Sequence, residues 1–178
     1  MDKNKILWIT RTALFLALLI IFQFISKNMG QFVTGSLVNL VLVESAVAVG
    51  IYSGLTVAVL SPFFAFFLGI GPAFPQLLPL IALGNAVIVL VTWLFINKWN
   101  QGLLSGVLGV AVGAVSKFLV LWIGIVKILL PLIPALKPQQ VQVLSASFSW
   151  PQLVTALIGA TLAVLIAPSL RKAMRNKT

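Results

Sequence analysis

Long apolar runs, separated by short polar or Gly/Pro-rich stretches, fill most of the 178-residue sequence. A helix needs about 20 mostly apolar residues to cross the hydrocarbon core of a bilayer. Six runs reach or approach that length, and the transmembrane helices that they predict span residues 6–25, 35–51, 55–70, 76–96, 103–126 and 151–167. The chain is therefore expected to be one all-α integral membrane domain over residues 1–178. The second and third runs are short, so a single re-entrant hairpin is an alternative for that stretch.

The predicted connections between these helices are unequal. Residues 26–31 are polar, and residues 69–75 carry two prolines and two glycines, a cluster that interrupts a helix. The longest connection, residues 131–150, contains a polar run. These three connections alternate with two minimal ones, so they lie on one side of the membrane. Because loops held on a rigid scaffold commonly carry function, the asymmetry indicates that something arrives from that side.

The composition agrees with a lipid-facing surface. Hydrophobic residues make up 61% of the chain and charged residues only 8%, whereas a soluble domain carries about 25% charged residues. The mean hydropathy is +1.16. The formal charge of +10 comes from basic residues at the two ends and in short connections. Nucleic-acid binding is not expected, because no basic stripe or aromatic platform accompanies the charge.

The basic residues predict the orientation of the chain. With six spans, both termini lie on one side, and basic residues accumulate on the cytoplasmic side of membrane proteins. Eight of the 12 Lys and Arg residues fall on the side of the termini, and three fall on the opposite connections. We therefore expect the N- and C-termini in the cytoplasm. The eight are Lys3, Lys5, Arg11, Lys98, Arg171, Lys172, Arg175 and Lys177, and the three are Lys27, Lys127 and Lys137.

Several kinds of chemistry are excluded by residue content. The chain has no Cys and no His, which removes disulfides, thiolate nucleophiles and the usual ligands of transition metals. It offers no pair of carboxylates inside the predicted spans, so acid–base catalysis lacks its groups. We therefore expect no enzyme activity, no catalytic residue, no bound metal and no cofactor.

Two ionisable residues stand out inside the predicted spans. Glu44 lies about half-way along the second span, and Lys117 lies in the outer half of the fifth. Such residues are costly in lipid and are commonly functional. A structural interpretation is that the two pair with each other, or that Lys117 extends its ammonium group to the membrane surface. A functional interpretation is that one or both line a polar cavity open to the outside.

Amides and a tryptophan near the outer helix ends extend the functional hypothesis. Amides in apolar helices often bond to a neighbouring helix, which is the alternative for Asn85. A Trp at a helix end is often an interface anchor, which is the alternative for Trp150. The functional hypothesis is an outward cavity with Asn85 at its deeper end and Glu44 holding Lys117. Its expected lining is Asn39, Gln76, Lys117 and Trp150.

Small residues recur at a four-residue spacing on three predicted helices. Such pairs allow two helix backbones to approach closely in a membrane. Packing within the chain is a sufficient explanation for the pair on the fifth helix. The pairs are Ala13-x-x-x-Ala17, Gly109-x-x-x-Gly113 and Ala156-x-x-x-Ala160.

The first helix resembles a known family. Its run TRTALFLALL, residues 10–19, is similar to the opening of the S components of energy-coupling factor (ECF) transporters, in which a basic residue precedes an Ala-x-x-x-Ala pair. The resemblance covers most of the chain and includes its size and its six spans. It continues through GSLVNL (35–40), LSPFFAF (60–66), GIGPA (69–73) and ALGNA (82–86).

This resemblance implies six helices, cytoplasmic termini and a site for a vitamin or related micronutrient near the outer face. It implies a location in the cell membrane of a prokaryote, and partners that are a transmembrane coupling subunit and two ATP-binding subunits. The family's docking face carries over to Ala13 and Ala17. In the family's toppling model, the S component rotates in the membrane and releases its solute inward. ATP is hydrolysed by the partners, and this chain has no phosphate-binding loop.

The resemblance leaves the solute open among several vitamins. Overall likeness favours pantothenate or cobalamin, and Lys117 and Lys127 are candidates to pair with a carboxylate or a phosphate. Two other kinds of protein remain as alternatives. They are a structural or assembly subunit of the membrane and a stand-alone solute carrier.

Overall fold

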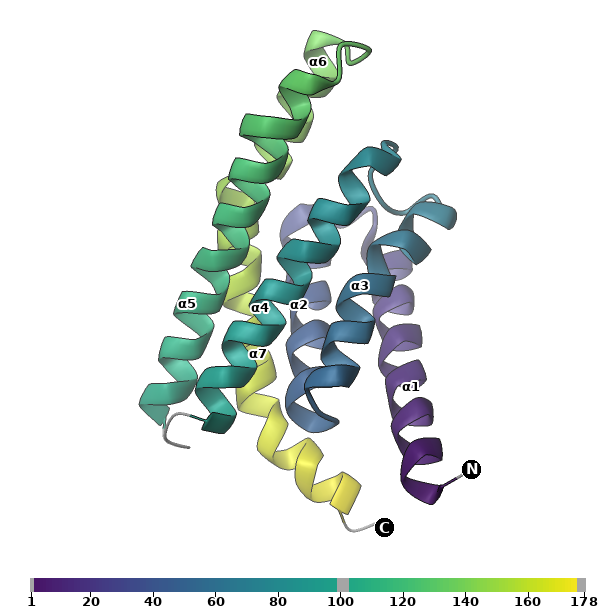
Figure 1. Ribbon diagram of the computed structural model, residues 1–178, viewed down its shortest axis with the longest axis vertical. Coiled ribbons are helices and arrows are strands. Elements are labelled where there is room, and N and C mark those ends of the chain that lie inside the picture. Colours follow the sequence, from purple (N-terminus) through teal and green to yellow (C-terminus); the bar gives the residue numbers. More distant parts are fainter. Residues whose placement is uncertain (1, 99–102, 176–178) are drawn as a thin grey trace.

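The chain is described by a computed structural model that covers residues 2–98 and 103–175. All regular elements in these residues are helical, and six long helices lie side by side as a bundle (Figure 1). The long helices are α1 (Lys3–Ser26), α2 (Gln31–Ala48), α3 (Ile51–Phe67), α4 (Leu78–Lys98), α5 (Leu103–Leu121) and α7 (Trp150–Arg175). The shorter ones are two 3₁₀ turns (Pro75–Leu77 and Leu130–Leu132), a π-helix (Trp122–Leu129) and α6 (Pro138–Ser147).

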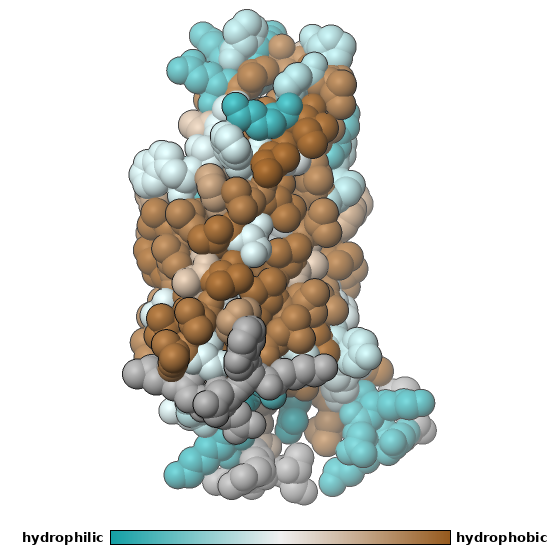
Figure 2. Space-filling model, turned by 60° about the vertical axis from the view of Figure 1, so that its left-hand side comes forward, coloured by the Kyte–Doolittle hydropathy of each residue, from teal (hydrophilic) through white to brown (hydrophobic). Residues whose placement is uncertain are grey.

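The helices have the length and composition of membrane spans. Five of them in the described part of the chain are long and apolar enough to cross a bilayer, and α3 is a shorter apolar helix. At 1.5 Å per residue, the 17 residues of α3 extend about 26 Å, close to the thickness of the hydrocarbon core. Figure 2 shows a hydrophobic belt between two hydrophilic ends. The prediction of an all-α integral membrane protein with six helices is confirmed.

The two ends of the bundle differ. At one end, here called the terminal end, lie the start of α1, the end of α7 and the turn between α2 and α3 (Figure 1). At the opposite end, the loop end, lie the connection before α2, the segment before α4 and helix α6. Helices α2 and α3 are separate antiparallel helices whose turn reaches the terminal end. There Val47 accepts a hydrogen bond from Arg171 of α7, so a re-entrant hairpin does not describe them.

Several helix bounds differ from those expected from the sequence. Helix α2 begins at Gln31, four residues earlier than expected, and α7 continues through Pro168 to Arg175. Near its end, the carbonyl of Met174 accepts a hydrogen bond from Arg11, which joins α7 to α1. The expected connection after residue 96 falls partly on residues 99–102, which lie outside the described residues.

The long connection at the loop end contains a helix that the hydrophobic pattern did not predict. Helix α6 starts with Pro138 at its first position, which suits a residue without an N–H group. The side chain of Gln140 accepts a hydrogen bond from the backbone N–H of Lys137 at 2.9 Å, which closes the first turn. The helix packs against the π-helix that continues α5, and these two elements project together beyond the rest of the bundle (Figure 1).

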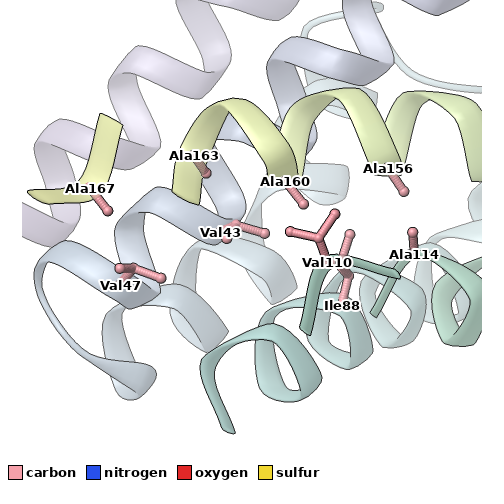
Figure 3. Packing of buried hydrophobic residues seen from close by; sticks show 9 residues of the cluster. All are labelled: Val43, Val47, Ile88, Val110, Ala114, Ala156, Ala160, Ala163 and Ala167. Atoms are coloured by element: carbon pink, nitrogen blue, oxygen red, sulfur yellow. The ribbon is translucent and has the colours of Figure 1, made fainter. Parts of the chain in front are cut away.

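Small residues on α7 form the centre of the largest buried cluster. Figure 3 shows them facing larger aliphatic side chains of α2, α4 and α5. Helices α2 and α7 make the most extensive contact in the bundle and run in the same direction. A Cβ atom placed on Gly159 of α7 would lie 2.6 Å from the Cβ of Asn39. The cluster contains Val43, Val47, Ile88, Val110, Ala114, Ala156, Ala160, Ala163 and Ala167.

Glycines on α5 set its distance from α4. A Cβ on Gly113 would lie 2.6 Å from the hydroxyl oxygen of Thr92, and one on Gly109 would lie 2.8 Å from the Cβ of Phe95. Thr92 also donates a hydrogen bond to the carbonyl of Gly109 at 3.2 Å. The prediction that this glycine pair packs within the chain is confirmed. The close approach of α4 and α5 brings Asn85 and Lys117 within hydrogen-bonding distance.

Candidate functional site

Three polar side chains from three helices meet in the interior of the bundle. The Nζ atom of Lys117 on α5 donates hydrogen bonds to the Oδ1 atoms of Asn39 on α2 and Asn85 on α4, each at 2.7 Å. The exposed fractions of Lys117, Asn39 and Asn85 are 3%, 1% and 4%. We call these residues the Lys117 centre. Asn39 lies eight residues into α2, about 12 Å below the loop end of that helix.

The backbone places these side chains and orients their amides. Gly113 and Lys117 are four residues apart on α5, so the close contact at Gly113 brings Lys117 against α4. The Nδ2 group of Asn39 donates to the carbonyl of Gly35 at 2.8 Å. A lysine ammonium group can only donate, so both amide oxygens must face it. The amide nitrogens therefore point away from Nζ.

Glu44 does not belong to this group. The predicted contact between Glu44 and Lys117 is wrong, because Lys117 bonds to the two asparagines and both carboxylate oxygens of Glu44 are buried without a hydrogen-bond partner. Glu44 follows Asn39 by five residues on α2, which turns it about 140° around the helix axis. It lies one turn before Val47, whose carbonyl accepts a hydrogen bond from Arg171 at 2.7 Å. Glu44 therefore sits toward the terminal end.

Two other predicted residues lie at the loop end. Gln76 is exposed in the 3₁₀ turn before α4. Trp150 starts α7, is 61% exposed and packs against Phe32 with ring centroids 5.5 Å apart. The structure thus brings Asn39, Asn85 and Lys117 together, places Gln76 and Trp150 at the loop end, and leaves Glu44 apart.

Further polar residues join α2, α6 and α7 at the loop end. The carbonyl of Ser147 accepts hydrogen bonds from the side-chain amides of Gln31 and Gln152, the latter at 3.1 Å. Gln31 and Gln152 are not among the residues predicted for the site. A signal for them exists, because Gln31, Gly35 and Asn39 recur every four residues and so share one face of α2.

Two buried polar atoms in the same half of the bundle have no hydrogen-bond partner. They are the Oγ atom of Ser36, one turn above Asn39, and the Oε1 atom of Gln23 on α1. Buried polar groups in folded proteins are nearly always paired, so each unpaired one requires an explanation. A bound solute or water would supply the missing partner for Ser36.

A cavity of about 950 Å³ lies elsewhere, between α5 and α7 at the terminal end. Aliphatic side chains such as Val107, Val110 and Val164 line it, with Arg171 and Lys172 at one edge. None of the predicted solute-binding residues lines this cavity. We therefore place the candidate site at the Lys117 centre, where polar groups from three helices converge.

The outer surface of α1 is the second candidate for function. Ala13 and Ala17 are both exposed, and the large residues Leu14, Leu18 and Ile21 beside them are exposed as well. The opposite side of α1 faces the bundle, where Thr12 donates a hydrogen bond to Ser53 of α3 at 2.9 Å. Within residues 2–98 and 103–175, the face with the two alanines therefore makes no contact that would explain its small residues.

Six apolar helices packed as a bundle define a multi-pass membrane protein, and its buried ionisable residue marks a candidate solute site. Comparison with family models makes this specific, because residues 8–171 match the family described as "ECF transporter, substrate-specific component". The chain belongs to that family, as the resemblance of its first helix indicated. Searches of curated proteins and of solved structures gave no match. Membership identifies the chain as a transporter subunit that binds a small molecule and associates with an ECF module.

Proposed function

We propose that the chain takes up a vitamin or related micronutrient at the Lys117 centre and delivers it inward with a shared energising module. The module would comprise a transmembrane coupling subunit and two ATP-binding subunits. The observation that supports the site is the buried ammonium group of Lys117, held at 2.7 Å by amides from two other helices. Burying such a group in a membrane protein is costly, and it commonly marks a solute pathway.

The solute would enter from the loop end. Gln76 and Trp150 are placed there to contact it at the mouth, and Asn39, Asn85 and Lys117 would contact its inner part. Apolar walls with a few fixed polar groups are typical of small-molecule sites. Ser36 is an additional contact, because its buried hydroxyl lacks a partner. Glu44 is excluded from the proposed site by its position on α2.

The proposed site is tested by calorimetry with the solute that the purified protein retains, identified by mass spectrometry. Lys117→Ala should weaken binding roughly 10- to 100-fold, because a hydrogen bond to a charged group contributes about 1.5–3 kcal/mol. Lys127→Ala is the matched control, since Lys127 is exposed and its ammonium lies 4.9 Å from the ring centroid of Trp122. Equal affinities of parent and Lys117→Ala protein would place the site elsewhere.

The terminal end is proposed to face the cytoplasm of a prokaryotic cell. Arg11 bonds to Met174, Arg171 bonds to Val47 and Lys172 lies beside Arg171, all at this end. Basic residues favour the inner side of a membrane, which supports this orientation. Single cysteines replacing Lys137 and Lys172 can be probed in intact cells, because the chain has no other cysteine. A membrane-impermeant thiol reagent should label position 137 and spare position 172. Labelling of position 172 but not of position 137 would show that the terminal end faces the outside.

The exposed face of α1 is proposed to dock on the coupling subunit. Helix contacts in membranes favour small residues, and Ala13 and Ala17 present them to the outside of the bundle. Uptake by cells that lack a coupling subunit would instead identify a stand-alone carrier. Normal docking by a protein that retains and binds no solute would identify an assembly subunit.

A further inference from the structure

We infer that the solute carries a carboxylate, for which Lys117 is the counter-ion. This inference rests on the proposed function and names the class of substrate for the same site. It is drawn from the hydrogen-bonding capacity left at the centre and from the shortage of acidic residues in the chain.

The groups left unused around Lys117 are donors. The ammonium group has three N–H donors, and two of them are taken by the oxygens of Asn39 and Asn85. One of the two amide N–H groups of Asn39 donates to the carbonyl of Gly35. Within the described residues, the third N–H of Lys117 and the amide nitrogen of Asn85 have no hydrogen-bond acceptor, and the Ser36 hydroxyl is unpaired. A ligand that completes this arrangement must therefore supply acceptor oxygens.

Neither acidic side chain of the protein lies beside Lys117 in the described residues. Asp2 and Glu44 are its two acidic residues. Asp2 is exposed before α1 at the terminal end, and the carboxylate of Glu44 contacts no hydrogen-bond donor. Two neutral amide oxygens solvate the ammonium group but leave its net charge uncompensated. Because a buried charge is stable only when it is paired, a negatively charged group of the solute is the missing partner.

A carboxylate fits this centre better than a phosphate. The centre offers one positive charge, which balances a single negative charge, and a phosphate monoester would leave an excess negative charge inside the bundle. Phosphates are commonly held by Arg or by helix N-termini, and neither is part of the Lys117 centre. Lys27 and Lys127 are exposed and face the rings of Phe24 and Trp122.

The centre is also closely packed. A Cβ on Gly159 would touch Asn39, and one on Gly84, next to Asn85, would lie 2.8 Å from a methyl group of Leu121. Such packing suits the narrow acid end of a small molecule. Of pantothenate and cobalamin, only pantothenate carries a free carboxylate, so the inference favours pantothenate or another small carboxylic acid over cobalamin.

The test compares acids with neutral analogues in which an amide or an alcohol replaces the carboxylate. Binding of pantothenate and pantothenol, biotin and biotinamide, and nicotinate and nicotinamide is measured by calorimetry on the purified full chain. Binding of the compound retained through purification is measured in the same way, and, if that compound is an acid, it is compared with the amide made from it. We expect at least one acid to bind, and roughly 10- to 100-fold more tightly than its analogue. In Lys117→Met the preference should fall to less than about threefold, whereas Lys127→Met should keep it.

The outcomes separate this inference from the proposed site. If a neutral or cationic compound binds best and Lys117→Met weakens it, the site is right and the carboxylate is wrong. If an acid binds equally well to parent and Lys117→Met protein, the site itself is wrong, and the inference fails with it. Absence of binding by every compound overturns both. Asn85→Ala provides a second variant if Lys117→Met does not fold, and it should weaken the acid more than its analogue.

Discussion

Helices α1 and α7 carry the same spacing of small residues in opposite surroundings. Ala156 and Ala160 on α7 are completely buried, and they face α2, α4 and α5 (Figure 3). Ala13 and Ala17 on α1 are exposed on the outside of the bundle. Only 11% of the apolar window of α1 is buried, compared with 33% for the segment that includes α7. The two helices share the spacing of small residues, but the helices that surround each pair differ.

The difference shows what a small-residue pair means in a membrane protein. The pair permits a close approach of two helices but does not name the second helix. On α7 the second helix is α2 of the same chain, which Gly159 contacts directly. On α1 no helix of the described chain occupies that position. The α1 face with Ala13 and Ala17 has the small residues that close helix contact needs and is left uncovered, which is consistent with docking on another membrane subunit.

The largest effect is expected on the α7 side of this comparison. Gly159→Leu would force a side chain into the backbone of α2, where even a Cβ atom would lie 2.7 Å from the nitrogen of Leu40. Overpacking typically costs about 1–3 kcal/mol, and a clash with a backbone should place this variant near about 3 kcal/mol. Thermal unfolding and gel filtration in detergent should show a loss of folded protein. The neighbouring Ile158→Leu, at an exposed position, is the control, and equal stability of both variants would contradict the α2–α7 contact.

On the α1 side, Ala13→Leu should leave the isolated protein folded and its solute affinity within about twofold of the parent, because its position is exposed. Uptake and copurification with the coupling subunit should fall at least about tenfold, since the larger side chain blocks close helix approach. Ala13→Ser, which stays small, should retain both.

Leu83→Phe, at an exposed position on α4, controls for a general effect of bulk at the lipid surface. Lost affinity with preserved assembly in Ala13→Leu would show that this face does not dock.

The smallest effect concerns the buried side of α1. Thr12→Val removes the hydrogen bond to Ser53 that joins α1 to α3 and keeps the shape of the side chain. Interhelical hydrogen bonds in membrane proteins contribute about 0.6 kcal/mol on average, so the loss of stability should be of that order. Unfolding in detergent measures it. A loss above about 2 kcal/mol would mean that α1 is fastened mainly through this bond rather than by apolar contact.

The sequence by itself determined the class of the protein. Apolar runs long enough to cross a bilayer can satisfy their backbone hydrogen bonds only as helices, so the six spans followed from hydropathy alone. The missing Cys and His residues restricted the chemistry, and the first helix pointed to the family that residues 8–171 match. Helix α6 was missed because its polar composition carries no signal of a membrane span, and its start depends on the local bond between Lys137 and Gln140.

Only the tertiary structure decided which polar groups meet. From the sequence, Glu44 was the natural partner of Lys117, because opposite charges inside lipid attract strongly. The helical turn between Asn39 and Glu44 sends the two side chains to different faces of α2, and Gly113 brings α5 close to α4. Lys117 therefore meets Asn39 and Asn85. Ala13 is exposed and Ala160 is buried for a similar reason. The exposure of a residue depends on which helices surround it, and that arrangement arises only when all six helices pack together.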